Sequence, residues 1–205
     1  MRRIPSTQLK QFHPMTPTTV SPPATIRHAR PADIPVIRAM QQRSMLVLSG
    51  HFYSDDEVAG FLTQYGTMDD AVVAEGHFFV AENHAGKILG SGGWTRRRPA
   101  YARERGKSPE AEALPTVRSV FVEPAAARRG VASSIMARVE RDAIDHGVRE
   151  LSLTATLPGV ALYVRLGYLA LGSERLSLNN GNGFACIRMT KRIDGDPSSA
   201  VRRAD

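Results

Sequence analysis

One stretch constrains the fold of this chain more than any other, the run from Val117 to Met136. It opens with Val117–Val122, whose β-branched and aromatic residues predict a buried strand. Pro124 ends the strand, and after a short turn apolar residues recur at helical spacing, at positions 131, 135, 136, 139 and 143. A buried strand that leads through a short turn into an amphipathic helix predicts an α/β fold.

The turn between this strand and this helix has the composition of a phosphate-binding site. The first amide N–H groups of a helix have no partner within the helix, and the helix dipole favours negative charge beside them. Gly130 and Ala132 keep large side chains away, so a diphosphate can approach the backbone closely. Arg128 and Arg129 add positive charge just before the helix. Residues 128–133 therefore predict a cradle for a diphosphate.

The same residues resemble the acetyl-CoA-binding motif of the GNAT superfamily of N-acetyltransferases, Arg/Gln-x-x-Gly-x-Gly/Ala. The motif falls on Ala127–Ala132, with Ala127 in place of the usual Arg or Gln. A second segment, Leu162–Tyr168, resembles the family's Leu-Tyr-x-x-x-Gly-Phe/Tyr segment and follows in the expected order. The resemblance covers roughly residues 25–190 and implies a GNAT-like three-layer α/β/α domain with a mixed, centrally splayed β-sheet.

The resemblance implies acetyl-CoA or coenzyme A as the cofactor and an amine as the acetyl acceptor. It places the pantetheine arm along the strand and the diphosphate on the cradle, and Thr156 stands where many members carry an asparagine that contacts the cofactor. The cofactor-binding residues that it implies are Val120, Phe121, Val122, Arg128, Arg129, Gly130, Val131, Ala132, Ser133 and Thr156.

Tyr163 matches the family position of the general acid that protonates the coenzyme A thiolate. A phenol with a pKa of about 10 carries its proton at neutral pH, as a general acid must. The other interpretation is a core tyrosine on a short amphipathic helix; with both motifs present we favour catalysis.

The general base and the acceptor contacts are less defined. The strand Thr116–Val122 holds no carboxylate or imidazole that could act as the general base. Two alternatives stay open. Glu75, His77 or Glu123 acts as the base through a water molecule, or the acceptor amine arrives already deprotonated. In the family, two early helices border the acceptor pocket. The substrate-contact candidates are His51 and Tyr53 in the predicted loop between those helices and Trp94, for which we favour packing in the sheet. We expect no metal site.

The chain divides into one domain and two tails. Residues 1–24 contain five prolines and no acid, which predicts a disordered or loosely packed basic arm, although a true start at Met15 stays open. The acetyltransferase domain is expected over 25–192, with a tail over 193–205. The arginine-rich connection 95–113 is a lid, an arm for an acidic partner or a solvated loop, and we favour the loop.

Within the domain, the expected elements follow from local patterns. These are a strand over 25–29, a helix opening at Arg30–Asp33, a helix behind the capping box Ser54–Glu57 and a hairpin of 77–82 and 87–94. Further along the chain, we expect a strand over 150–155 parallel to Val117–Val122, a short helix over 158–166 and a closing hairpin of 168–178 and 183–189. On the long helix, Arg138/Asp142 and Arg141/Asp145 are expected as i, i+4 pairs on the solvated face.

Composition limits the alternatives. The net charge of +7 suggests a nucleic-acid partner, but five of those charges lie before residue 33 and the presumed domain is nearly neutral, so we do not expect one. No apolar run approaches the ~20 residues that cross a bilayer, so we expect no membrane partner. The single cysteine, Cys186, excludes an internal disulfide, fits a cytoplasmic location and is expected to be buried.

Four functions therefore stay in view. The leading hypothesis is an acetyl-CoA-dependent N-acetyltransferase acting by direct attack on a small primary amine. A peptide or protein amine is the alternative acceptor, and a non-catalytic acyl-CoA sensor or a nucleic-acid-associated protein are the other classes. Retention of Tyr163 favours an enzyme over a sensor. A homodimer stays open.

Overall fold

The structure is a computed structural model that describes residues 24–97 and 114–193. The predicted N-terminal arm and C-terminal tail lie outside the described residues except for Ala24 and Ile193, and so does the connection 95–113 beyond Arg97.

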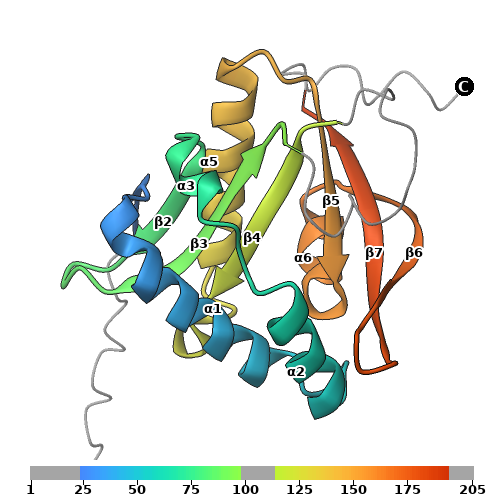
Figure 1. Ribbon diagram of the computed structural model, residues 1–205. Coiled ribbons are helices and arrows are strands. Elements are labelled where there is room, and N and C mark those ends of the chain that lie inside the picture. The colour runs from blue at the N-terminus through green and yellow to red at the C-terminus, as the bar shows by residue number, and fades with distance from the viewer. Residues whose placement is uncertain (1–23, 98–113, 194–205) are drawn as a thin grey trace, which may run out of the picture.

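A seven-stranded mixed sheet in the order β1-β2-β3-β4-β5-β7-β6 forms the centre of the domain (Figure 1). Neighbouring strands run antiparallel except β4 and β5, which run parallel. The strands are β1 Thr25–His28, β2 Phe78–Glu82, β3 Ile88–Thr95, β4 Thr116–Val122, β5 Glu150–Thr156, β6 Leu169–Ser177 and β7 Gly183–Arg192. The predicted mixed α/β sheet is confirmed.

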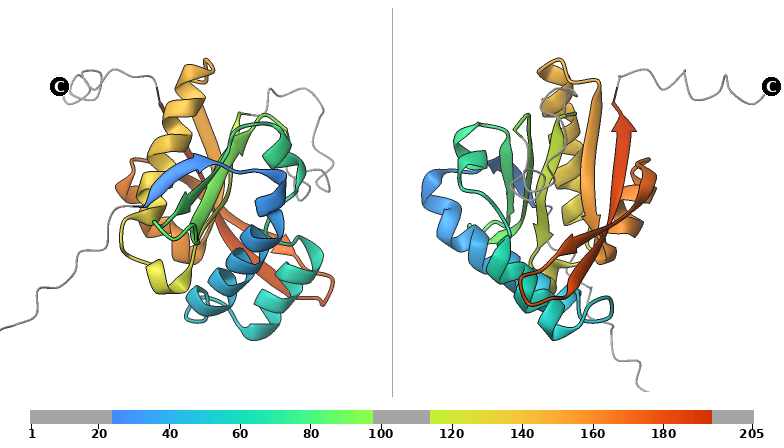
Figure 2. Two further views of the ribbon diagram at one scale, coloured as in Figure 1. Left: turned by 90° about the vertical axis from the view of Figure 1, so that its left-hand side faces the viewer. Right: turned by 45° about the vertical axis from the view of Figure 1, so that its right-hand side comes forward.

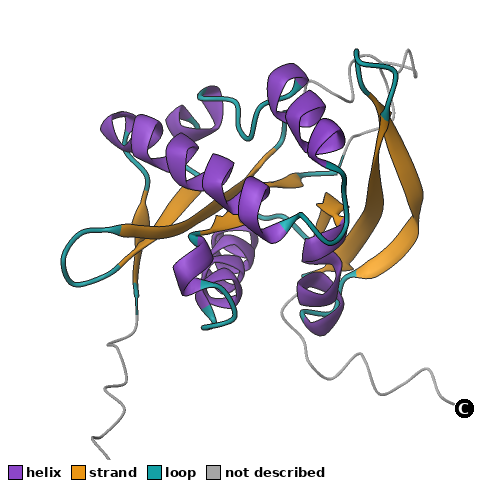
Figure 3. Ribbon diagram, turned by 90° about the horizontal axis from the view of Figure 1, so that it is seen from below, coloured by secondary structure: helices purple, strands orange, loops and turns teal. Residues whose placement is uncertain are grey.

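Helices cover both faces of the sheet (Figures 2 and 3). On one face α5 packs on β2, β3 and β4, and on the other α1 packs on β3 and β4 with α2 beside it. The helices are α1 Ile34–Leu48, α2 Asp55–Gln64, α3 Ala71–Ala74, α5 Val131–Asp145 and α6 Val160–Arg165, with short 3-10 turns η1 Pro31–Asp33, η2 Pro124–Ala126 and η3 Leu157–Gly159. The three-layer arrangement is the one expected from the sequence.

Local signals place the helix ends where the sequence predicts them. Ser54 Oγ accepts the Glu57 N–H and the Glu57 carboxylate accepts the Ser54 N–H, so the capping box starts α2. Gly66 follows α2 at a φ of +63° and Gly147 follows α5 at +75°, a backbone region that favours glycine at helix ends. The four-residue helix α3 lies in a stretch for which the sequence predicted no element.

The long helix α5 buries the predicted apolar face. Val131, Ile135, Met136, Val139 and Ala143 are all buried in the main core cluster between α5 and the sheet. The expected pair of Arg138 with Asp142 is present, with the guanidinium nitrogen 3.7 Å from the carboxylate oxygen. Its expected place on the solvated face is wrong, because Asp142 is 4% exposed and lies on the buried face. Its carboxylate accepts a hydrogen bond from the indole nitrogen of Trp94 at 2.8 Å, so the charge is held inside by a polar partner from β3.

The glycines of β3 let neighbouring elements approach. A Cβ at Gly93 would lie 2.4 Å from the carbonyl oxygen of His77 and 2.6 Å from the ring of Phe78. A side chain there would push β2 from β3, so glycine is required by close packing. Cys186 is buried in β7, as expected. Among the helices that the structure describes, none is long and apolar enough to cross a membrane.

Candidate active site

The two parallel strands diverge at the centre of the sheet. Only one register pair joins β4 to β5, Thr116 with Ser152 at the start of both strands. Beyond Thr116, β4 pairs with β3 on one side, and among the described residues no strand pairs with its other side. The predicted central splay is therefore present, and it leaves backbone hydrogen-bonding groups of β4 without a ladder partner.

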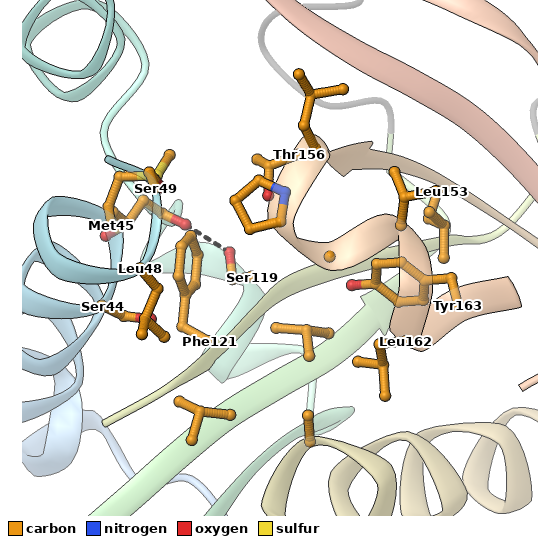
Figure 4. A pocket seen from close by; sticks show the side chains of 18 of the residues that line it. Ser44, Met45, Leu48, Ser49, Ser119, Phe121, Leu153, Thr156, Leu162 and Tyr163 are labelled. Carbon is orange, nitrogen blue, oxygen red and sulfur yellow. Dashed lines mark hydrogen bonds between the residues drawn. The ribbon is translucent and has the colours of Figure 1, made fainter. Parts of the chain in front are cut away.

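A cavity of about 1050 Å³ occupies this splay (Figure 4). Its walls come from α1 and α2, the loop 66–69, β4, the turn before α5, β5 and the segment η3–α6. The cavity thus connects the start of α5 with the layer formed by α1 and α2. Such a concave site at the carboxyl ends of parallel strands is a common place for ligands.

A bulge shapes the β4 wall of the cavity. The pairing register with β3 shifts between Ser91 and Gly93, and Ser119 adopts a φ of +52°, which is uncommon for a residue other than glycine. The hydroxyl of Ser119 donates to the carbonyl of Thr67 at 2.7 Å, and its carbonyl accepts from Ser91 Oγ at 3.2 Å. These bonds hold a costly backbone conformation at the cavity wall. Val120, Phe121 and Val122 follow the bulge and line the cavity.

The predicted phosphate cradle forms one end of the cavity. Gly130 is the N-cap of α5 with a φ of +83°, and the space around a Cβ at this position is open. The first helical hydrogen bond of α5 joins the Ser134 N–H to the Gly130 carbonyl at 3.0 Å. The backbone N–H groups just before Ser134 therefore have no hydrogen-bond partner within the helix. The cradle residues that line the cavity are Arg128, Gly130, Val131, Ala132 and Ser133, whereas Arg129 is exposed and lies outside the lining.

Tyr163 lies on α6 across the cavity from β4, with its hydroxyl directed to the cavity interior (Figure 4). Its ring packs edge-on against Tyr168, with centroids 5.7 Å apart, and above Gly159. Among the described residues the hydroxyl has no hydrogen-bond partner, and burial raises the pKa of Tyr163 above its ordinary value. The phenol is therefore a protonated donor with a free hydrogen-bonding direction. Thr156, at the end of β5, also lines the cavity.

The three predicted substrate contacts lie elsewhere. His51 is exposed and does not line the cavity. The Tyr53 hydroxyl donates to the Ala185 carbonyl at 2.7 Å and accepts from the Leu157 N–H at 2.8 Å, so this side chain joins the loop before α2 to β7 and η3. Trp94 is buried in the core beside Asp142, as favoured from the sequence.

None of the three groups considered as a base lines the cavity. The Glu123 carboxylate pairs with Arg43 at 2.7 Å, and Glu75 accepts a hydrogen bond from Thr95 Oγ1. His77 bonds Asp142 at 2.8 Å through Nδ1. The one carboxylate among the described lining residues is Asp69, which the sequence analysis did not single out. Its Oδ1 accepts the Ala71 N–H at 3.0 Å, which forms a local turn. The short pattern Asp-Asp-Ala is only a weak sequence signal for such a turn.

A separate polar cluster surrounds Asp142 at the far end of α5. One ligand-type atom from each of His77, Asp142 and His146 lies within 4.8 Å of the others, an arrangement that could in principle hold a metal ion. The carboxylate oxygen is already an acceptor for Trp94 and His77, and Arg138 lies 3.7 Å from the other oxygen. The nearby guanidinium and the occupied lone pairs favour a hydrogen-bonded network over a cation site.

Comparison with known proteins agrees with this geometry. Residues 74–169, which include the bulged strand, the cradle and Tyr163, match the family model described as an acetyltransferase (GNAT) domain. No curated protein sequence matches the chain significantly.

Three solved structures illustrate the fold. The GCN5-related N-acetyltransferase from Rhodopseudomonas palustris superposes with a TM-score of 0.65 at 21% identity, covering 85% of this chain and 98% of that one. A GNAT superfamily phosphinothricin acetyltransferase from Sinorhizobium meliloti in complex with acetyl-CoA gives 0.58 at 18%, covering 85% and 91%. The PaiA N-acetyltransferase from Thermoplasma acidophilum in complex with coenzyme A gives 0.59 at 11%, covering 82% and 98%. At these identities the likeness establishes the fold.

Proposed function

Because residues 74–169 match a GNAT acetyltransferase domain, we propose that the protein transfers the acetyl group of acetyl-CoA to the primary amine of a small molecule, by direct attack in a ternary complex. One observation carries the proposal. A single cavity connects the cradle at the start of α5, the unpaired edge of β4 and the hydroxyl of Tyr163. The residues proposed to anchor the cofactor, to align it and to donate a proton thus line the same cavity.

The residues of this cavity fit the proposed cofactor. The open space at Gly130, the α5 amides and the Arg128 guanidinium suit a diphosphate, which is a compact dianion. The backbone of Val120–Val122 can pair with an extended chain that carries amides, because no strand occupies that edge. When bound, acetyl-CoA supplies an activated acetyl group as a thioester. Alignment of the reacting groups by these fixed elements supplies several kcal/mol of the barrier reduction.

Tyr163 is proposed as the proton donor. The leaving thiol sulfur requires a proton, and the Tyr163 hydroxyl carries one because burial keeps the phenol neutral. Its free hydrogen-bonding direction faces the cavity, so donation breaks no existing bond within the described residues. General acids of this kind contribute about 10²–10⁴-fold to the rate.

The helices that border one side of the cavity support a small acceptor. The helices α1 and α2 and the loop 66–69 stand over the β4 wall, opposite the α6 side. An extended peptide would need an open groove in this place. The small-molecule amine is therefore the proposed acceptor class.

Initial rates test the proposal directly. With acetyl-CoA and a panel of primary amines, release of the coenzyme A thiol should depend on the amine, and varying both substrates should give intersecting double-reciprocal plots. Parallel plots together with an isolable acetylated protein would show a covalent relay and overturn direct attack. Thiol release that no amine accelerates would overturn the N-acetyltransferase assignment.

A further inference from the structure

The end of the cavity opposite the cradle is built from carbon-rich side chains. We call this end the acceptor compartment; it comprises Met45, Leu48, Phe52, Phe61, Tyr65 and Phe121. They come from α1, the loop before α2, α2 and β4, so four separate segments converge on one apolar wall. In Figure 4, Met45, Leu48 and Phe121 lie together on the side of the cavity away from Tyr163.

The one hydroxyl among these six side chains, that of Tyr65, is already engaged, and so is the hydroxyl of the neighbouring Ser49. The Tyr65 hydroxyl donates to the Ser177 carbonyl at 2.9 Å, and the Ser49 hydroxyl donates to the Met45 sulfur at 3.1 Å. A ligand that packs against these six side chains therefore meets mainly hydrocarbon and aromatic surface.

Two of these side chains keep apolar surface facing outward. Phe52 is 50% exposed although it lines the cavity, and Leu48 is partly exposed at the end of α1. An exposed aromatic side chain at the rim of a concave site gains stabilisation when an apolar ligand covers it. The compartment thus offers an uncovered apolar surface where a substrate would lie.

The charges of the cavity lining disfavour a polycation. Among the described lining residues, the positive side chains are Arg118, Arg128 and Arg165, and the one carboxylate is that of Asp69. A diamine or polyamine would bring two or more ammonium groups, of which Asp69 could pair with one. The remaining ammonium group would have to enter the apolar compartment without a counter-ion, which is costly.

We propose that the acceptor compartment selects primary amines carried on an apolar body, aryl or branched alkyl, and disfavours hydrophilic diamines. This inference rests on the proposed function, because the compartment is the acceptor end of the same cavity. The apolar body packs between α1, α2 and Phe121, and the amine group points back along the cavity toward β4 and Tyr163.

Two probe amines and two matched variants test the proposal. The ratio of kcat/KM for 2-phenylethylamine over 1,4-diaminobutane should exceed about tenfold in the wild-type protein, because the compartment covers the phenyl body and offers the second ammonium group of the diamine no counter-ion. Leu48→Asn should reduce that ratio about tenfold, mainly through KM for 2-phenylethylamine. Leu46→Asn is the control, since Leu46 lies on the same helix, is 61% exposed and does not line the cavity. It should leave the ratio unchanged.

Calorimetric titration of 2-phenylethylamine into the protein saturated with coenzyme A gives a readout independent of turnover. The amine should bind to the wild type and to Leu46→Asn, and about tenfold more weakly to Leu48→Asn. Preference for 1,4-diaminobutane, equal effects of the two variants, or absence of 2-phenylethylamine binding would overturn the inference. Turnover of the diamine alone would leave the proposed function intact, whereas Leu48-dependent binding without any turnover would overturn the function and keep the inference.

Discussion

The side-chain amide of Gln41 donates a hydrogen bond to Ser91 Oγ at 2.9 Å, and both side chains are fully buried. Ser91 in turn donates to the carbonyl of Ser119, which the Gln41 amide also reaches at 3.5 Å. A residue of α1 and a residue of β3 thus hold the bulge of β4 in place. Because the bulge sets the direction of the strand residues that follow it, the pair helps to set how Val120–Val122 face the cavity.

Gln41→Leu should weaken acetyl-CoA binding as well as the fold. Loss of the amide leaves Ser91 with one fewer donor and should destabilise the protein by about 1–3 kcal/mol. The Kd for acetyl-CoA, measured by calorimetry well below the melting temperature, should rise several-fold because the bulge loses a support. Gln42→Leu is the matched control, being the next residue on α1 and exposed. An unchanged Kd in a destabilised Gln41→Leu protein would restrict Gln41 to a structural role.

Tyr163→Phe should lower kcat by one to three decades while acetyl-CoA affinity changes little. The substitution keeps the ring that packs on Gly159 and Tyr168 and removes the hydroxyl that faces the cavity. Pre-steady-state measurement of thiol release isolates the chemical step. Tyr168→Phe removes a hydroxyl from the neighbouring ring, which does not line the cavity, and should keep the wild-type rate. Equal rates in both variants would make Tyr163 a core residue only.

Ionisation of Tyr163 should not lower kcat at any pH up to at least 10. Burial raises the pKa of this phenol above its ordinary value of about 10, so its protonated, donating form persists below the raised pKa. Activity that depends on this proton is present at lower pH and is lost only as the pH rises through the raised pKa. A decline of kcat centred between pH 8 and 9 that Tyr163→Phe abolishes would contradict the assignment.

Gly130→Glu should abolish stabilisation by coenzyme A. The carboxylate would project into the open space over the cradle and repel a diphosphate, whereas wild-type protein should gain about 2.7 kcal/mol at a ligand concentration of 100 Kd. Thermal melting with and without coenzyme A measures the shift. Gly130→Asn serves as the control, because asparagine tolerates the positive φ of this position better than most residues and adds no charge. A Tm shift in Gly130→Glu equal to that in wild type would remove the diphosphate from this position.

Features encoded by neighbouring residues were predictable. The start of α5 follows from Pro124, Gly130 and the apolar spacing after it, and the α2 start from a capping box four residues long. The burial of Asp142 was not predicted. Asp142 stands three residues after the buried Val139 and thus on the apolar face of the helix, but we placed it on the solvated face because its side chain is charged. Its indole partner lies 48 positions away, beyond the reach of local patterns.

The acceptor side of the site depends on long-range packing, so the sequence did not reveal it. Tyr53 was a reasonable pocket candidate, but Ala185, the acceptor of its hydroxyl, lies 132 positions away and draws the side chain into the core. Met45, Leu48 and Phe61 sit on helices whose periodicity indicates an apolar face without telling whether protein or ligand covers it. The bulge at Ser119 leaves no trace in the residue types of β4.

The single register pair between β4 and β5 divides the sheet into two halves, β1–β4 and β5–β7, which share a core cluster that includes the buried face of α5. A cofactor chain lying in the splay would act as the missing strand, so the hydrogen-bonding continuity of the sheet would depend on cellular cofactor supply. The sheet would then be less rigid across the splay when coenzyme A is scarce and more rigid when it is plentiful. Its resistance to unfolding and proteolysis would follow the acetyl-donor pool itself.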